Sequence, residues 1–164
     1  MRYFIRLCFG LAFALLYLGS GTKEIKLTEG IQPGNLAPEI HLQGVEMREN
    51  AYVLVQFWGA YNPQSRVLNT QMHNAISQSK AENLQLVSIS LDENPAVFKG
   101  VIKADHLDES TQWNETEGKH SEVFKKYRLK SGCSNWLIDS KGMIVARNLR
   151  PSEVLATIHA SILN

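Results

Sequence analysis

The strongest hydrophobic signals in the chain are two mainly apolar runs of strand length. Residues 52–58 (YVLVQFW) are rich in β-branched and aromatic residues, and residues 84–91 (LQLVSISL) form the second strong strand pattern. Runs of this composition are typical of strands that are covered on both faces. The two segments therefore predict the centre of a β-sheet.

Weaker patterns predict three further strands. Ile40 and Leu42 alternate with polar neighbours as a short strand. The apolar runs 136–139 and 143–146 flank Ser140-Lys141-Gly142, which favours a tight turn between antiparallel partners. A hairpin is therefore expected near the C-terminus.

Four segments have helical features. Asn62 is a preferred N-cap, Pro63 suits the first helical position, and apolar residues then recur on one face of the segment (Val67, Leu68, Met72, Ala75 and Ile76). The sequence Asp92-Glu93-Asn94-Pro95 starts a second helix, residues 121–127 form a short third, and Pro151 opens the last. The predicted order is β, β, α, β, α, α, β, β, α.

This order predicts one α/β domain over residues 34–164. Helices that alternate with buried strands, followed by a hairpin, favour a three-layer fold with a central mixed β-sheet flanked by helices. The 164 residues contain no internal repeat and no low-complexity stretch.

The first 21 residues have the pattern of a secretory signal peptide. Arg2 and Arg6 precede an apolar run at 7–18, and Gly19-Ser20-Gly21 supplies small residues for cleavage. The run is shorter than the roughly 20 residues of a spanning helix. We therefore expect an exported protein of the periplasm or cell envelope. An uncleaved anchor, with residues 3–18 in the membrane, is the alternative.

Residues 22–33 are polar and unpatterned, as expected of a linker between the leader and the domain.

The charge balance and the cysteine count exclude some classes of partner and of active site. Seventeen Lys and Arg residues balance sixteen Asp and Glu residues, so the net charge of +1 predicts no nucleic-acid partner. Two cysteines, Cys8 and Cys133, form no Cys-x-x-Cys pair, and Cys8 lies in the leader.

Other chemistry finds little support in the sequence. The five histidines include no i, i+4 pair, so neither a metal nor a cofactor is predicted. Ser65 lacks a nucleophile elbow, and His73 lies about 12 Å further along the same helix, out of hydrogen-bond reach. Asn114-Glu115-Thr116 is a glycosylation sequon, which matters only in a eukaryotic cell.

The element order and four local sequences resemble the thioredoxin fold. The similarity is greatest to the TlpA- and ResA-type envelope thiol-disulfide oxidoreductases and to the related redoxins. The four sequences are GNLAPEI at 34–40, VLVQFWGA at 53–60, VSISLD at 87–92 and WLIDSKG at 136–142. This resemblance covers nearly all of residues 34–164 and implies a thioredoxin-like domain.

The resemblance also implies a degenerate active site. In the family, a Cys-x-x-Cys pair at the helix start is activated by the helix dipole and free amides. Here Asn62 stands at the position of the nucleophilic cysteine and Ser65 at that of the resolving cysteine, with Pro63 and Gln64 between them. No catalytic residue of that pair is intact.

A second departure falls on the facing loop. The family places a cis proline six residues before the aspartate that ends the next strand, and that position, counted from Asp139, is Cys133. A cis bond without proline costs about 3 kcal/mol, so we expect a trans Gly132–Cys133 bond. Cys133 remains as a lone thiol candidate, with a small loop-filling residue as the other interpretation.

We expect the aromatic residues Trp58, Tyr61 and Trp136 to cluster around this site. Core packing explains most of this cluster, and a binding surface formed together with Pro63 and Gln64 is the other interpretation. The predicted function is a redox-inactive binding or assembly module for another envelope protein or a peptide. The alternative is a one-thiol thiol-disulfide oxidoreductase or redoxin that uses Cys133.

Overall fold

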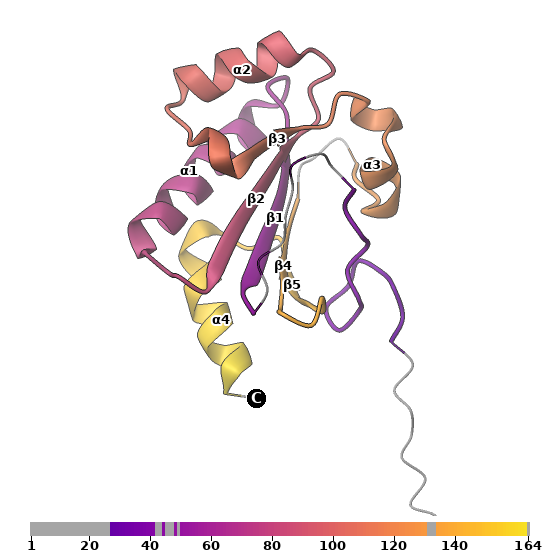
Figure 1. The fold of residues 1–164 in the computed structure, drawn as a ribbon, viewed down its shortest axis with the longest axis vertical. Coiled ribbons are helices and arrows are strands. Elements are labelled where there is room, and N and C mark those ends of the chain that lie inside the picture. Colours follow the sequence, from indigo (N-terminus) through magenta and orange to yellow (C-terminus); the bar gives the residue numbers. More distant parts are fainter. Residues whose placement is uncertain (1–26, 42–43, 45–47, 49, 131–133, 164) are drawn as a thin grey trace, which may run out of the picture.

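The computed structural model describes residues 27–41, 44, 48, 50–130 and 134–163 (Figure 1). The predicted leader at 1–21, Leu42 and Cys133 lie outside the described residues. Among the described residues, no helix has the length and apolar character needed to cross a membrane.

A five-stranded mixed sheet forms the centre of the domain. Its strands are β1 (Tyr52–Trp58), β2 (Leu84–Ser90), β3 (Gln112–Asn114), β4 (Asn135–Ile138) and β5 (Ile144–Arg147). They lie in the order β3-β2-β1-β4-β5. Strands β1, β2 and β3 run parallel, whereas β4 is antiparallel to both β1 and β5.

Helices cover both faces of the sheet. They are α1 (Pro63–Ser79), α2 (Pro95–Ala104), α3 (Glu122–Lys126) and α4 (Val154–Ile162). Helices α1, α2 and α4 lie on one face, and α3 lies on the other with residues 27–41 (Figure 1). The predicted three-layer mixed-sheet fold is confirmed.

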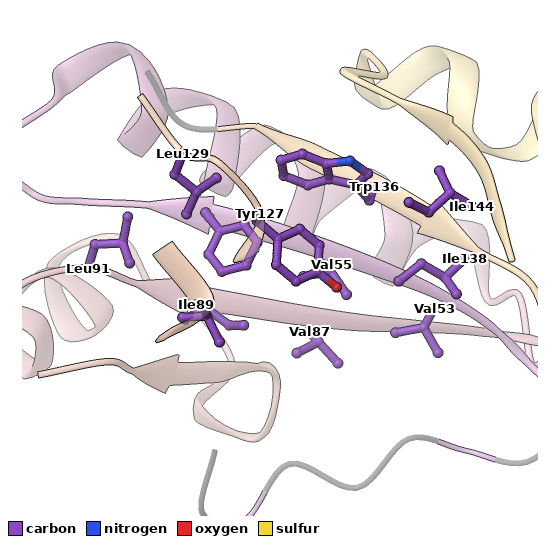
Figure 2. Packing of buried hydrophobic residues seen from close by; sticks show 12 residues of the cluster. Val53, Val55, Val87, Ile89, Leu91, Tyr127, Leu129, Trp136, Ile138 and Ile144 are labelled. Atoms are coloured by element: carbon purple, nitrogen blue, oxygen red, sulfur yellow. The ribbon is translucent and has the colours of Figure 1, made fainter. Parts of the chain in front are cut away.

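The alternation of side chains along β1 separates the core into two faces. Val53, Val55 and Phe57 face α3, in the cluster that also contains Tyr127 and Trp136 (Figure 2). The Tyr127 ring centroid lies 5.0 Å from those of Phe57 and Trp136, within the range of favourable aromatic packing. Leu54 and Trp58 face the opposite layer of helices.

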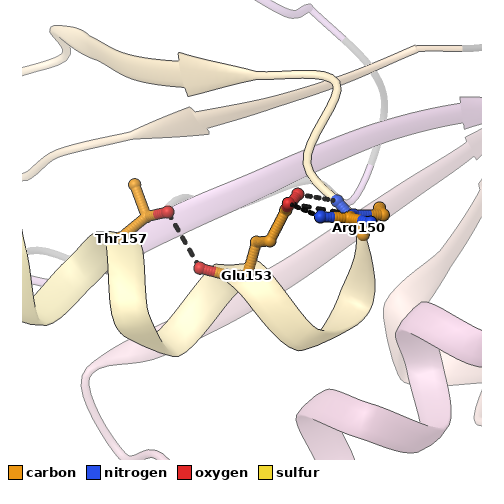
Figure 3. Close-up of polar contacts among 3 residues, drawn as sticks. All are labelled: Arg150, Glu153 and Thr157. Atoms are coloured by element: carbon orange, nitrogen blue, oxygen red, sulfur yellow. Dashed lines mark hydrogen bonds and ion pairs between the residues drawn. The ribbon is translucent and has the colours of Figure 1, made fainter.

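The start of α4 is fixed by a local polar cluster. The Arg150 backbone N–H donates to Glu153 Oε2 at 2.8 Å, and the Arg150 guanidinium donates to Glu153 Oε1 (Figure 3). These hydrogen bonds hold the pKa of Glu153 below its usual range. Thr157 Oγ1 donates to the Glu153 carbonyl at 2.8 Å. As predicted, Pro151 lies at the beginning of this helical segment, in a 3₁₀ turn.

The N-terminal part of the fold differs from expectation. Ile40 is not in a strand, and it packs against the core on the α3 face. Instead, Leu36 bridges Met143 and Glu29. The strand prediction at Ile40 was therefore wrong. The apolar side chain of Ile40 between polar neighbours reflects an irregular segment that buries one side against the core.

Residues 28–33 pack on the domain instead of forming a free linker. The Leu36 N–H donates to Thr28 O at 3.0 Å, and the Gly34 N–H donates to Ile144 O at 2.8 Å. Gly34 has a φ of +85°, a left-handed conformation that glycine adopts readily. The polar composition of this segment reflects its surface position, while its backbone is paired.

Four buried polar residues lie in one row across the sheet. The strand register aligns Gln112, Ser88, Gln56 and Asn135. Ser88 Oγ donates to Asn69 on α1, and the Asn135 side chain pairs with the backbone of residue 149. The Gln56 amide is 1% exposed, and both its Nε2 and Oε1 atoms lack a hydrogen-bond partner among the described residues.

Candidate functional site

The candidate site lies where β1 leads into α1, and Asn62 caps the helix. Its backbone is extended, with φ −116° and ψ 99°, and its Oδ1 accepts a hydrogen bond from the Ser65 N–H at 3.1 Å. Pro63 occupies the first turn. The predicted N-cap is therefore confirmed, and Asn62 satisfies a helix amide that would otherwise lack an intrahelical partner.

Ser65 holds the loop that precedes the helix. Only 5% of the residue is exposed. Its Oγ accepts from the Gly59 N–H at 3.2 Å and lies 2.9 Å from the Asn62 carbonyl, to which it donates. The hydroxyl is thus used for structure at the start of the helix.

No described histidine is placed to act as a base for Ser65. His73 is directed elsewhere, because its Nε2 accepts a hydrogen bond from the Asp108 N–H at 3.2 Å. The Ser65 hydroxyl is instead bonded to the backbone of Gly59 and Asn62.

Asp92 anchors the opposite side of the same loop. It is 6% exposed, and the Ala60 N–H donates to its two carboxylate oxygens at 2.9 and 3.1 Å. Ser90 Oγ donates to Asp92 Oδ2 at 2.6 Å, and Asn114 Nδ2 donates to the Asp92 carbonyl at 2.8 Å. The loop after β1 is thereby fixed to the loop after β2.

Sequence reasoning missed this role of Asp92, because it assigned the segment only to a helix start. The helix cap is Asn94, whose Oδ1 accepts from the Ala96 N–H at 2.9 Å. A carboxylate directly after a buried strand was the available signal. The Asn114 amide nitrogen, which would carry a glycan in the sequon, donates a hydrogen bond in the same network and is therefore not free.

Tyr61 is the exposed aromatic residue of the site. Its ring packs closely over Gly59. A side chain on residue 59 would collide with it, since a Cβ atom there would lie 2.5 Å from the ring. The ring is also 5.6 Å from Lys119 Nζ, within range of a cation–π contact. Tyr61 is 52% exposed, and Pro63 and Gln64 beside it are exposed too.

The two tryptophans do not join this surface. Trp58 is 0% exposed and packs against Phe98, Val101 and Ile102 in the layer containing α2. Trp136 is 2% exposed on the opposite face of the sheet, where its Nε1 donates to Ile31 O. Core packing therefore accounts for both tryptophans. They do not cluster with each other or form a surface with Tyr61, because strand alternation points them into opposite core layers.

A cavity of about 580 Å³ adjoins the loop on the β2 side, with Ala60, Tyr61, Val97 and Lys119 in its lining. In the first turn of α1, the Arg66 guanidinium makes a bidentate ion pair with Asp105, which joins α1 to the end of α2. Hydrogen bonds from Arg66 lower the pKa of Asp105. The helix start is therefore held in place from several directions.

Ser134, the first described residue after the position of the facing loop, lies beside the end of β1. Ser134 O accepts a hydrogen bond from the Phe57 N–H at 3.0 Å. Cys133 and the Gly132–Cys133 bond lie outside the described residues, so the predictions about them stay predictions. Among the described residues, no group of three or more His, Cys, Asp or Glu side chains could hold a metal ion.

Comparisons with known proteins place this fold in a family. No family model matches the chain, and no curated protein matches it. Solved structures do match it. A thioredoxin-like protein from Parabacteroides distasonis is 39% identical with a TM-score of 0.73, and the match covers 82% of this chain and 99% of that one.

Two further matches are thiol-disulfide oxidoreductases. The C-terminal domain of a putative one from Bacteroides thetaiotaomicron is 30% identical, with a TM-score of 0.60, over 68% of this chain and 77% of that one. One from Bacteroides fragilis is 27% identical, with a TM-score of 0.57, over 70% and 82%. The chain therefore belongs to the family of thioredoxin-like thiol-disulfide oxidoreductases.

Proposed function

We propose that this domain is a redox-inactive binding or assembly module built on an oxidoreductase scaffold. Thiol-disulfide exchange needs a thiolate to attack and a second thiol to resolve the mixed disulfide. The residues at the corresponding positions are an amide and a hydroxyl, Asn62 and Ser65. The observation that carries the proposal is that both side chains are used in capping the helix and holding the loop before it.

The proposed docking surface is the exposed segment Tyr61, Pro63 and Gln64. Three features support it: the segment is exposed, the cavity beside Tyr61 can receive a partner side chain, and the Asp92 network fixes the loop. A fixed loop lowers the entropy cost of binding. The partner is an exported envelope protein or peptide, met after export directed by residues 1–21.

The first test is an insulin-reduction assay with the wild-type protein and Cys133→Ser. Neither protein should show turnover above the uncatalysed rate. Turnover by the wild type that disappears in Cys133→Ser would replace this proposal with the one-thiol alternative. Turnover that survives in the variant would contradict the assignment of Asn62 and Ser65 as inert.

The second test asks whether the segment binds. A photo-crosslinking amino acid placed at Gln64 should capture a defined envelope protein in the cells that naturally produce this protein. The same group at Lys99, exposed on α2, is the matched control. Equal capture profiles at the two positions would show that the Tyr61–Gln64 segment is not a docking surface.

A further inference from the structure

A second cavity lies on the α3 face of the sheet and carries only positive charge. Its volume is about 440 Å³, and Arg128, Lys130 and Arg147 line it together with Ser134 and Trp136. No acidic residue is among the described residues that line it. Arg128 and Lys130 follow α3, whereas Arg147 ends β5, so the fold brings together cations from two separate segments.

These cations have no anionic partner in the described part of the chain. The ion pairs among the described residues use His41, Arg66, Lys125 and Arg150. Arg147 makes a hydrogen bond to the Ile31 carbonyl at 3.4 Å, which leaves its charge uncompensated. Like charges gathered around one concave site raise the local positive potential and attract an anion.

The cavity adjoins the strand that leads to the candidate site. Ser134, in its wall, accepts the backbone hydrogen bond from the Phe57 N–H at 3.0 Å. Phe57 lies near the end of β1, after which the chain passes through Gly59 and Tyr61 into α1. A partner bound at the start of α1 therefore lies at the end of the same strand, β1, that Ser134 in the wall of the basic cavity contacts.

We propose that this cavity binds an acidic peptide segment of the partner protein, an inference that rests on the proposed binding function. Arginine guanidinium groups form bidentate hydrogen bonds with carboxylates, and lysine adds a point charge. The cations come from two separate segments that line the cavity. Several carboxylates spaced along one peptide chain can pair with cations on both segments, whereas one small anion pairs with fewer of them. Acidity of the partner then contributes to selectivity and association rate.

The test uses three fluorescein-labelled pentapeptides, Glu-Glu-Ile-Glu-Glu, Gln-Gln-Ile-Gln-Gln and Lys-Lys-Ile-Lys-Lys, titrated at an ionic strength of about 0.1 M, where the Debye length is about 10 Å. The variant is Arg128→Gln with Lys130→Gln. The matched control is Lys99→Gln with Lys103→Gln, which removes the same charge from α2. Circular dichroism checks that both variants are folded.

The acidic peptide should bind best, and the Arg128→Gln/Lys130→Gln variant should weaken its binding on the order of tenfold. The α2 control should change binding by no more than about twofold, because distant exposed charges are screened. Equal binding of the acidic and glutamine peptides, or equal loss in both variants, would overturn the inference.

Crosslinking at Gln64 separates this inference from the function on which it rests. Unchanged partner capture in the Arg128→Gln/Lys130→Gln variant would overturn the acidic-segment inference and leave the docking function standing. Acidic-peptide binding that depends on Arg128 and Lys130, in a protein without specific capture at Gln64, would support the cavity and contradict the docking segment.

Discussion

Replacing Asn62 with alanine tests whether the residue at the nucleophile position is a structural cap. The variant loses the Asn62 Oδ1 acceptor, which lies 3.1 Å from the Ser65 N–H. Loss of such a cap costs roughly 0.5–2 kcal/mol of stability. Ser65 Oγ still reaches the Asn62 carbonyl, so part of the local structure remains. We expect a loss of about 1 kcal/mol in the free energy of unfolding.

Asn62→Asp is the matched control, because it keeps an oxygen acceptor and adds a negative charge. The first turn of α1 contains no acidic residue, so that charge meets the positive end of the helix dipole without like-charge repulsion from that turn. Such an interaction is worth roughly 0.3–1 kcal/mol. Asn62→Asp should therefore be at least as stable as the wild type at neutral pH.

Urea unfolding followed by circular dichroism measures both variants, and thermal melts give a second reading. A loss of 1 kcal/mol corresponds to roughly 3–5 °C in Tm for a domain of this size. The capping argument fails if Asn62→Ala is as stable as the wild type. It also fails if Asn62→Asp is no more stable than Asn62→Ala.

Three further predictions follow from named contacts. Gln56→Met should raise the free energy of unfolding by about 1–2 kcal/mol in urea titrations, because it removes two buried polar atoms without partners; a loss of stability would show that the amide is satisfied. Gly59→Ala should displace the Tyr61 ring, because the added Cβ atom would lie 2.5 Å from it, and should therefore reduce the amount of partner crosslinked from position 64. An unchanged amount of crosslinked partner would contradict this prediction. Pairing with Arg66 lowers the pKa of Asp105 in the folded protein. The pair therefore stabilises the fold fully at pH values above the unfolded-state pKa of Asp105, which is near 3.9. This stabilisation is lost as the pH falls through the lower pKa of the folded state. Arg66→Met should reduce that part of the acid dependence in unfolding curves measured between about pH 5 and 2.

The centre of the fold was predictable because its signals are local. The strands β1 and β2 are mainly apolar runs of strand length, and the hairpin of β4 and β5 has its own turn sequence. Strand β3 was missed because it has only three residues and depends on pairing with β2. Such a strand is defined by tertiary contact, which no local pattern reveals.

The candidate site was predictable in part. The cap at Asn62 follows from residue type and from Pro63, both local properties. The burial of Ser65 and the anchoring by Asp92 depend on where the β1 and β2 loops meet. The basic cavity depends on Arg147 approaching the segment after α3, which is distant in sequence.

The most direct test of the central claim restores the two thiols as Asn62→Cys with Ser65→Cys, in a Cys133→Ser background. The helix start spaces these positions as in a Cys-x-x-Cys pair, and the dipole favours a thiolate there. The measurement is free-thiol content by mass spectrometry after mild oxidation and maleimide labelling. The account predicts an intramolecular disulfide between residues 62 and 65 that dithiothreitol reverses. Two free thiols after oxidation would contradict the view that Asn62 and Ser65 occupy the positions of a lost redox pair.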